Sequence, residues 1–358
     1  MQEIDHGENI KRALQNLSDD GPIGVLPDYF VDRFIKIESI DDLVQKIKEK
    51  SMKSGGGSIR GIAQAEVKGG NAVNLAYALG TFGARVNLIT IAESLSSESL
   101  RSTFAKLPNV DLEIVAGKNG YTVALEFVEN SRHVNVMLSD TGDLKAFDGS
   151  LVSEQSWDKI AECKIIAVVN WAANSKGNDL CVRSFSKAKS KSRQTFFDPA
   201  DVSELGRVIP LLKKQVFDRG LVDIISLNDS ELRVMCNTLC SHVLPIDYSE
   251  ADLVSAVKKM ADTSGSIVDL HTRNMSVSAN SSDATVAYCH RVSQNIVTGA
   301  GDVWDAGDLI GHLLKWDIMD RLRFANAAAG LYVSGQSAEP PSLDQILDFI
   351  SKHRDYYH

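Results

Sequence analysis

Apolar runs and helix-period segments alternate through the second half of the chain. Each apolar run is short and ends in a polar residue. The segments between them carry apolar residues every three or four positions, which is the spacing of one helix face. This alternation predicts an α/β fold: a doubly wound, largely parallel sheet flanked by helices, with its functional edge at the carboxyl ends of the strands. The predicted strands span residues 164–170, 194–197, 222–227, 266–270 and 286–292, and the predicted helices span residues 177–188, 203–215, 250–262, 318–334 and 342–353.

The first half of the chain adds a broken strand and two helices. Residues 24–37 predict a strand that is interrupted by a turn and then resumes with alternation, and Asp32 stands where the apolar pattern breaks. An acid that bounds a buried strand can lie at the ligand edge of the sheet or simply form a turn, and the residues alone leave both open. Helices are predicted at residues 8–18 and 40–50, and a buried strand at residues 86–91.

A hairpin is predicted between residues 121 and 140. Its two strand-like runs, 122–128 and 133–138, flank the polar residues 129–132 and share one apolar face. Neighbouring parallel strands need a long crossover, and this connection is short. The hairpin is therefore expected in a small sheet apart from the main α/β body.

Composition narrows the class of protein. The chain has 358 residues, is 44% hydrophobic and 24% charged, and carries a net charge of -9. These values predict a globular protein without the basic face of a nucleic-acid binder. No apolar run approaches the length of a membrane span, and the first residues lack the pattern of a signal peptide. We therefore expect a cytoplasmic protein with no membrane partner.

A small-residue turn opens the most informative segment. Thr298, Gly299, Ala300 and Gly301 precede Asp302, and apolar residues at helical spacing follow. Such a turn predicts a helix N-terminus, where free N–H groups and the helix dipole attract an anion such as phosphate. Asp is favoured in the first turn of any helix, so the turn alone leaves simple capping and phosphate binding about equally open.

Two further polar pairs stand at predicted helix starts. Asn71 and Asn74 follow a glycine pair and lie three residues apart, so their amides share one face and can bond the hydroxyls of a polyol. Asn228 ends a buried strand, and Glu231 follows three residues later. That second pair can order a metal-phosphate site or form an ordinary capping box.

Three fragments together resemble the ribokinase or PfkB-type sugar and nucleoside kinases. With Asp32 near the start and Asn326 near the end, the resemblance covers about residues 22–350. It implies a ribokinase-like fold, with one kinase domain over residues 1–358 and a small β lid inserted as segments of about 33–68 and 119–141. The fragments are Gly69-Gly70-Asn71-Ala72-Val73-Asn74-Leu75-Ala76 with Gly83, Asn228 to Glu231, and Gly299-Ala300-Gly301-Asp302 with Ala306-Gly307.

The resemblance implies an activity and a role for each fragment. The activity is transfer of the γ-phosphoryl group of ATP, with Mg²⁺, to a hydroxyl of a small sugar, sugar acid, sugar phosphate or nucleoside. Asp302 is the implied general base, and the N–H groups of Gly299, Ala300 and Gly301 form the implied anion hole. The implied substrate residues are Asp32, Gly69, Gly70, Asn71 and Asn74. The implied nucleotide residues are Thr298, Asn326, Asn228 and Glu231, the last two ordering Mg²⁺ through water. A monovalent cation and a homodimer through the lid are also compatible with the resemblance.

The chain departs from the family pattern mainly on the nucleotide side. Ile296-Val297 stand where the family usually has Asp-Thr, and Asp269-Leu270-His271 replace Thr-x-Gly. Asp308 stands directly after Ala306-Gly307, where the family pattern usually has an apolar residue. These changes motivate a second hypothesis, a catalytically impaired sugar-binding or regulatory protein on the kinase fold. A Rossmann oxidoreductase is disfavoured because no Gly-x-Gly-x-x-Gly follows the first strand. The acceptor, and the choice of ATP or ADP as donor, are left open by the sequence.

Overall fold

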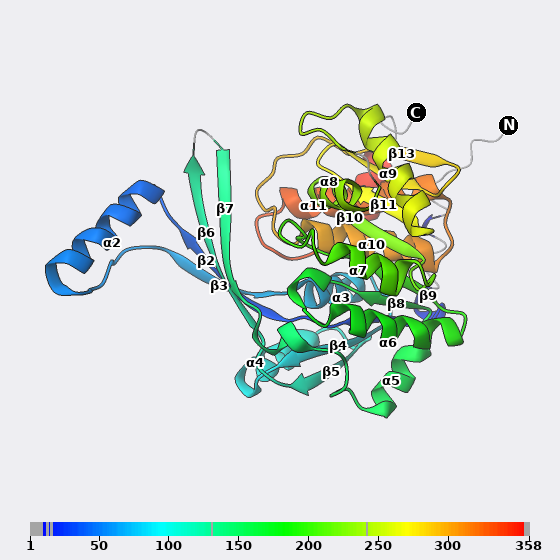
Figure 1. The fold of residues 1–358 in the computed structure, drawn as a ribbon, viewed down its shortest axis with the longest axis horizontal. Helices are drawn as coiled ribbons and strands as arrows, with labels where there is room; N and C mark the ends of the chain where they lie inside the picture. Colours follow the sequence, from blue (N-terminus) through cyan, green and yellow to red (C-terminus); the bar gives the residue numbers. More distant parts are fainter. Residues whose placement is uncertain (1–9, 12–13, 15–16, 130–131, 241–242, 354–358) are drawn as a thin grey trace.

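The computed structural model describes residues 10–353 apart from 12–13, 15–16, 130–131 and 241–242. Its body is a nine-stranded sheet with helices on both faces, and a four-stranded sheet projects from one side (Figure 1). The strand order in the large sheet is β13-β12-β11-β10-β9-β8-β1-β4-β5. The predicted doubly wound, largely parallel sheet with a small separate sheet is confirmed.

Seven neighbouring strands of the large sheet are parallel, and two antiparallel strands extend one edge. Every residue of β1 and β8 is buried, as expected of central parallel strands that helices cover on both faces. The strands are β1 (Ile23–Leu26), β4 (Val86–Ala92), β5 (Val110–Ala116), β8 (Ile165–Val168), β9 (Gln194–Phe197), β10 (Ile224–Asn228), β11 (Ile267–His271), β12 (Met275–Ala279) and β13 (Ala284–Tyr288).

Two hydrophobic clusters, one on each side of the large sheet, form most of the core. The helices that contribute to them are α3 (Asn71–Thr81), α4 (Ser94–Phe104), α5 (Glu154–Ala161), α6 (Gly177–Ser190), α7 (Ile209–Leu212), α8 (Asp229–Met235), α9 (Glu250–Ser264), α10 (Ala300–Leu313), α11 (Ile318–Ser334) and α12 (Leu343–Lys352). Short 3₁₀ or π segments lie at Leu17–Asp19, Gly142–Ala146, Trp171–Ala173, Lys213–Phe217 and Cys236–Cys240. None of the helices in the described part of the chain is long and apolar enough to cross a bilayer.

Some predicted boundaries were wrong. The strand predicted at 286–292 ends earlier, at Tyr288; the Cys289 N–H still donates to the Asn274 carbonyl, and no further bond to β12 follows among the described residues. The helix predicted at 203–215 begins only at Ile209, where Pro210 suits the first turn of a helix. Most of the helix predicted at 8–18 lies outside the described residues.

Several elements were missed, among them two strands of the large sheet and two helices. Strands β5 and β12 contain polar residues within short runs, which weakened their pattern; Ser276 and Ser278 of β12 are nevertheless buried. Helix α4 begins at Ser94, in the serine-rich stretch that follows β4. Helix α5 follows Ser153, whose side chain caps its first turn.

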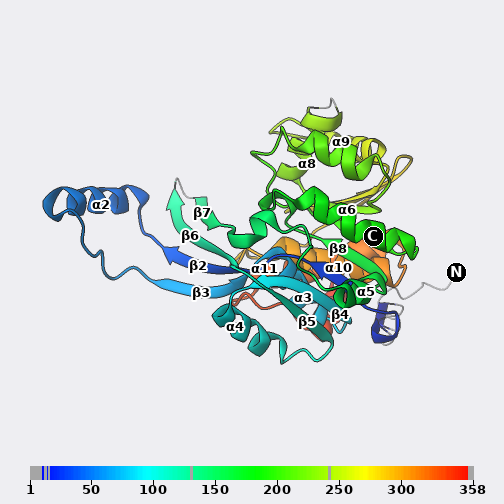
Figure 2. The same cartoon turned by 60° about the horizontal axis from the view of Figure 1, so that its bottom comes forward.

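The small sheet has the order β3-β2-β6-β7. The predicted hairpin is present as β6 and β7, which pair antiparallel from Tyr121 to Asp140. Helix α2 (Ile40–Ser54) connects β2 to β3 and lies at the far end of this sheet in both views (Figures 1 and 2). The strands are β2 (Phe30–Lys36), β3 (Gln64–Gly69), β6 (Gly120–Glu129) and β7 (Arg132–Asp140).

Candidate active site

Polar residues from distant parts of the chain meet at one edge of the large sheet. Because β1, β8, β9, β10 and β11 are parallel, their carboxyl ends lie together. Helices α3 and α10 begin at the same edge and pack against each other. The residues that end or follow the five strands are Asp28, Asn170, Asp198, Asn228 and His271.

The first turn of α3 is held by Asp28. Its carboxylate accepts hydrogen bonds from the backbone N–H groups of Asn71 (2.8 Å) and Ala72 (2.9 Å), and from the side-chain amide of Asn170 (2.8 Å). Gly70 precedes the helix with φ 93, and a Cβ there would lie 2.9 Å from the Tyr29 Cα. Asp28 therefore caps α3 and fixes the direction of its first side chains. We did not predict this role; the only local signal was a polar residue two positions after the end of β1.

The first turn of α10 is open, and the helix N-terminus that the sequence predicted is present. Gly299 is its left-handed N-cap residue with φ 85, and no side chain caps the helix. The Ala300 N–H donates to the Val297 carbonyl at 3.1 Å, so one of the three N–H groups expected in the anion hole is engaged within the protein. Within the described residues, the N–H groups of Gly299, Gly301 and Asp302 have no protein partner. They lie at the positive end of the helix dipole, where an anion is stabilised.

The two helix starts meet through a side-chain contact. The amide of Asn74 donates to the Asp302 carboxylate at 3.0 Å, although 228 residues separate them. Asp302 is only 7% exposed. Burial, and the negative charges of neighbouring aspartates, hold the pKa of Asp302 well above its usual value, against the lowering effect of the Asn74 amide. The predicted base and one predicted substrate residue are therefore in direct contact.

Two more aspartates add to the negative field around Asp302. Asp198 accepts a long hydrogen bond from the Asn71 amide (3.4 Å), and burial raises the pKa of Asp198 to about 6. The Asp32 carboxylate lies across the Cα of Gly69, where any Cβ would be 2.0 Å from its oxygen. Burial raises the pKa of Asp32 to about 6, against a hydrogen bond from Thr122. Asp198 was seen only as a strand end in the sequence and received no role there.

Asn228 and Glu231 form a complete capping box at the start of α8. The Asn228 side chain accepts from the Glu231 N–H at 2.9 Å, and the Glu231 carboxylate accepts from the Asn228 N–H at 2.8 Å. Burial and the nearby Asp198 raise the pKa of Glu231 well above its usual value. The capping interpretation is thus present in the structure, and the box sits at the same edge as Asp198. Its role in ordering a metal stays a prediction.

Thr298 and Asn326 occupy different surroundings. Asn326 is buried, with its carbonyl accepting from the Trp304 ring N–H at 2.8 Å and its NH₂ donating to the Ala287 carbonyl at 3.3 Å. Thr298 lies at the turn before α10, where its hydroxyl is 3.4 Å from the amide of Asn135 on β7. Thr298 therefore contacts the small sheet, while the amide of Asn326 is already bonded within the protein. Contact of either residue with a nucleotide stays a prediction.

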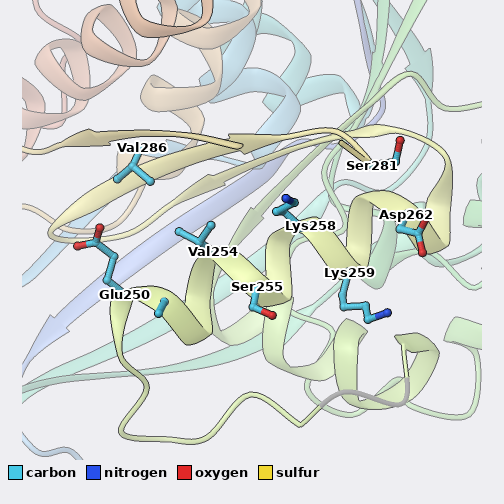
Figure 3. Close-up of a pocket in the computed structure, with 9 residues that line it drawn as sticks. Glu250, Val254, Ser255, Lys258, Lys259, Asp262, Ser281 and Val286 are labelled. Atoms are coloured by element: carbon cyan, nitrogen blue, oxygen red, sulfur yellow. The ribbon is translucent and has the colours of Figure 1, made fainter. Parts of the chain in front are cut away.

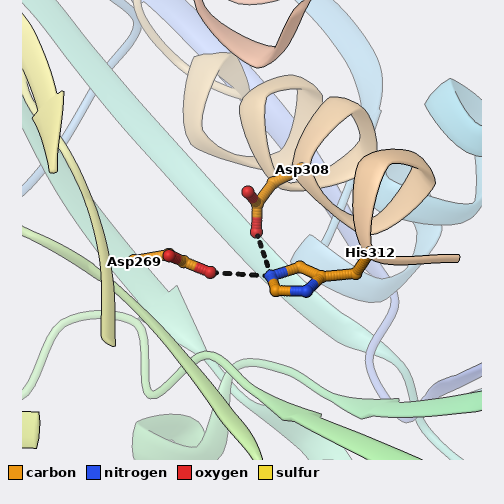
Figure 4. Close-up of side chains that lie close together, drawn as sticks. All are labelled: Asp269, Asp308 and His312. Atoms are coloured by element: carbon orange, nitrogen blue, oxygen red, sulfur yellow. Dashed lines mark hydrogen bonds and ion pairs between the residues drawn. The ribbon is translucent and has the colours of Figure 1, made fainter. Parts of the chain in front are cut away.

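The two departures Asp269 and Asp308 are parts of one buried ion cluster (Figure 4). Arg321 bonds to both carboxylates, reaching Asp269 at 2.7 Å, and also donates to Ser278 at 2.8 Å. His312 lies 2.8 Å from Asp269 and 3.5 Å from Asp308. Oxygen and nitrogen atoms of this kind can bind a metal, but here the Arg321 guanidinium supplies the positive charge. Asp269 therefore faces Arg321, while the next polar side chain along β11 lies at the open turn before α10.

That side chain is His271. Its ring packs on the Trp304 ring with centroids 5.1 Å apart, and its Cε1 lies 3.2 Å from the position that a Cβ of Gly301 would take. Burial lowers the pKa of His271 to about 4, so the ring is neutral near pH 7. The residue that replaces a glycine of the family pattern thus fills space next to the open end of α10.

An open groove lies away from this edge, between α9 and the β12–β13 hairpin (Figure 3). Its volume is about 950 Å³, and its charged lining residues are of both signs: Glu250, Lys258, Lys259 and Asp262. None of the candidate site residues lines it.

Comparisons with known proteins identify the family and the fold. The family model described as "pfkB family carbohydrate kinase" matches residues 35–345. The chain is similar to a ketohexokinase of Haloferax volcanii (22% identity, 91% of this chain and 86% of the relative) and to a 5-dehydro-2-deoxygluconokinase of Clostridium perfringens (24%, 81% and 85%). Among solved structures it resembles Arabidopsis thaliana ribokinase complexed with ribose and ATP, with TM-score 0.68, 16% identity and coverage of 92% and 98%.

The large sheet, the projecting small sheet and the open α10 turn together define a ribokinase-like α/β protein. The chain belongs to the PfkB family of carbohydrate kinases. It is therefore an enzyme of the phosphotransferase class, for which a nucleotide and a divalent metal are expected.

Proposed function

We propose that the enzyme transfers the γ-phosphoryl group of ATP to a hydroxyl of a small neutral sugar. The contact between Asn74 and Asp302 carries this proposal, because it brings an uncharged hydrogen-bonding residue and a candidate base together at an open helix N-terminus. That arrangement serves the three needs of phosphoryl transfer: alignment, acceptance of a proton and stabilisation of negative charge.

The acceptor is proposed from the charge of the site. Four carboxylates, those of Asp28, Asp32, Asp198 and Asp302, influence one another there, and their pKa values are all raised. No lysine or arginine of the described residues pairs with any of them. A negative field disfavours an acidic or phosphorylated acceptor. A neutral ketose, which the name of the Haloferax volcanii relative also suggests, is the first acceptor to test, ahead of a nucleoside and a keto sugar acid.

In the chemical step, groups of the chain act on the proton of the acceptor hydroxyl and on the phosphoryl group that the hydroxyl attacks. The hydroxyl oxygen attacks the γ-phosphorus, its proton passes to the Asp302 carboxylate, and the bond between γ-phosphorus and the ADP oxygen breaks. Asn74 orients Asp302 through its hydrogen bond. The free N–H groups of Gly299, Gly301 and Asp302 stabilise charge on the transferred group.

We assign the metal and the nucleotide to the start of α8, on the other side of the sheet edge from the acceptor. Mg²⁺ prefers oxygen ligands and keeps several waters, which fits the carboxylates of Glu231 and Asp198 and the carbonyl of Asn228. Bound there with the nucleotide, it would neutralise charge on the phosphates. We propose that Asn228 and Glu231 order it through water, since their oxygens also serve the capping box. A cytoplasmic location suits the use of ATP.

The test is an assay of Asp302→Asn. A coupled nucleotide-consumption screen over neutral ketoses, other sugars, keto sugar acids, sugar phosphates and nucleosides first identifies the acceptor. We then expect Asp302→Asn to lower kcat by about 10²–10⁴-fold, with acceptor binding nearly unchanged, because only proton transfer is removed. Near-native turnover by this variant would reject the role of Asp302. Tight sugar binding with no nucleotide binding or turnover in the wild type would instead favour the impaired, regulatory alternative.

The lid offers a surface for a homodimer. Apolar side chains of β6 and β7 are about half exposed: Val128 (52%), Val136 (43%), Met137 (49%) and Leu138 (58%). Because side chains alternate along a strand, Val136 and Leu138 lie on one face of the hairpin, and Val128 and Met137 lie on the other. Exposed apolar side chains on a sheet face are typical of an interface. We propose a dimer through these strands, and light scattering of the purified protein tests it: a monomer at micromolar concentration would reject it.

A further inference from the structure

The turn before α10 is attached to the end of α11. The backbone N–H groups of Asn295 and Ile296 donate to the Val333 carbonyl at 2.8 and 3.2 Å. The Asn295 side-chain amide donates to the Ser334 carbonyl at 2.9 Å. The last carbonyls of a helix have no partners within the helix, so these bonds satisfy α11 and hold the incoming chain at the same time.

Tyr332 makes the contact closest to the anion-binding groups. Its hydroxyl donates to the Thr298 carbonyl at 2.8 Å. The same oxygen lies 2.8 Å from the position that a Cβ of Gly299 would take, so it closes over the residue where the backbone turns left-handed. Tyr332 is only 5% exposed. Burial and the nearby Asp302 raise the pKa of its hydroxyl, which therefore remains a donor at physiological pH.

The Thr298 carbonyl and the Gly299 N–H belong to one planar trans peptide and point in opposite directions. A donor that holds the carbonyl on the α11 side therefore turns the Gly299 N–H away from α11. A rotated peptide would point a carbonyl oxygen, which repels anions, where an N–H group is needed. Glycine at 299 accepts either orientation with little steric cost, so the orientation depends on contacts made by neighbouring residues.

We propose that Tyr332 is a positioning residue: its hydroxyl fixes the 298–299 peptide so that the turn presents N–H groups to the transferred phosphoryl group. The inference rests on the proposed function and deepens it. Tyr332 touches no substrate in this account, because it acts only through the backbone of the turn. Its effect is expected on charge stabilisation in the transition state, and binding of the acceptor, whose residues are elsewhere, should change little.

The experiment compares Tyr332→Phe with Tyr288→Phe. Tyr288 is an exposed tyrosine at the edge of β13 whose hydroxyl bonds Glu250, so its variant also removes one hydroxyl, but away from the turn. We expect Tyr332→Phe to lower kcat by about 10- to 100-fold, at or below the effect of losing one oxyanion-hole donor. The KM for the acceptor should stay within about twofold of wild type, and the melting temperature within a few degrees. Tyr288→Phe should match wild type in all three.

Each other outcome decides against the inference or against the activity. Wild-type kcat in a folded Tyr332→Phe enzyme overturns it. A rise in the acceptor KM of Tyr332→Phe with kcat unchanged also overturns it, because the hydroxyl would then serve binding of the acceptor. A variant that fails to fold, or melts more than about ten degrees lower, shows a structural role and overturns it too. Absence of phosphotransfer by the wild-type enzyme would instead reject the proposed function, so the two failures are distinguishable.

Discussion

Replacing Arg321 by methionine would test how the buried ion cluster stabilises the protein. The Arg321 side chain is 3% exposed, and the carboxylates of Asp269 and Asp308 that it bonds are fully buried. Methionine fills a similar volume without charge. The variant therefore leaves two buried carboxylates with only His312 as a partner.

The expected loss is large because the remaining charges cannot reach water. Breaking a buried ion pair by removing one partner costs about 3–5 kcal/mol. A protein of this length has an unfolding entropy of about 0.75 kcal/mol/K at about 2.1 cal/mol/K per residue, so a loss of about 4 kcal/mol lowers the melting temperature by about 5 °C. Arg33→Met is the matched control. Arg33 pairs with Glu66 on the surface, with both side chains more than half exposed, so we expect a loss below about 1 kcal/mol.

The stability lost in Arg321→Met should depend on pH, and the direction of that dependence can be predicted. Burial opposes the charge of Asp269, and Arg321 outweighs it, so the pKa of Asp269 lies below its usual range. In Arg321→Met burial acts unopposed by that charge and raises the folded-state pKa above the unfolded value. A buried acid of this kind destabilises the fold once it ionises, and the penalty disappears as it takes up a proton at low pH. Denaturant unfolding should therefore show a smaller difference between variant and wild type at pH 5 than at pH 8. A difference under 1 kcal/mol at both pH values would refute the reasoning.

Three further predictions concern the site. Asn74→Ala removes a donor that lowers the pKa of Asp302, so the acid limb of kcat/KM, where activity rises as Asp302 loses its proton, should move to higher pH in a rate profile. Glu231→Gln keeps a capping box, so stability should change by under about 1 kcal/mol while the Mg²⁺ concentration for half-maximal rate rises at least about tenfold. Gly70→Ala should cost more stability than Gly83→Ala in urea unfolding: both have φ 93, but only at Gly70 does a Cβ meet neighbouring backbone, whereas Gly83 has nothing within 4 Å.

Each of these has a control and a contrary outcome. Asn71→Ala should leave the acid limb in place, since Asn71 bonds Asp198; an equal shift in both variants would contradict a specific effect of Asn74. Asp252→Asn changes the matching acid of the capping box of α9 and should not alter the Mg²⁺ requirement; an unchanged requirement in Glu231→Gln would remove that residue from the metal site. Equal costs at the two glycines would show that the space around Gly70 does not matter.

Much of the site could be predicted where chemistry depends on neighbours in sequence. The open turn at Gly299 to Asp302 and the shared face of Asn71 and Asn74 follow from spacing alone, and the structure contains both. Asp28 and Asp198 could not be found this way, because a single acid after a strand looks the same whether it forms a turn or caps a distant helix. Their contacts join residues 43 and 127 positions apart.

The departures from the family pattern at Asp269 and Asp308 also could not be explained from the sequence. Asp269 and Asp308 each looked like an isolated change on the nucleotide side. In the structure they share one partner, Arg321, and a second, His312. The compensation joins β11, α10 and α11, so no local pattern could have revealed it.

By itself the sequence determined the alternation of strands and helices, the hairpin of the small sheet and the helix starts, because periodicity, glycine conformation and capping act over a few residues. Tertiary structure alone decided which polar groups face each other, and how far burial and neighbouring charges move their pKa values. Those properties depend on distances across the fold and on exclusion of water, and the contact between Asn74 and Asp302 forms only when two helices 228 residues apart pack at one sheet edge.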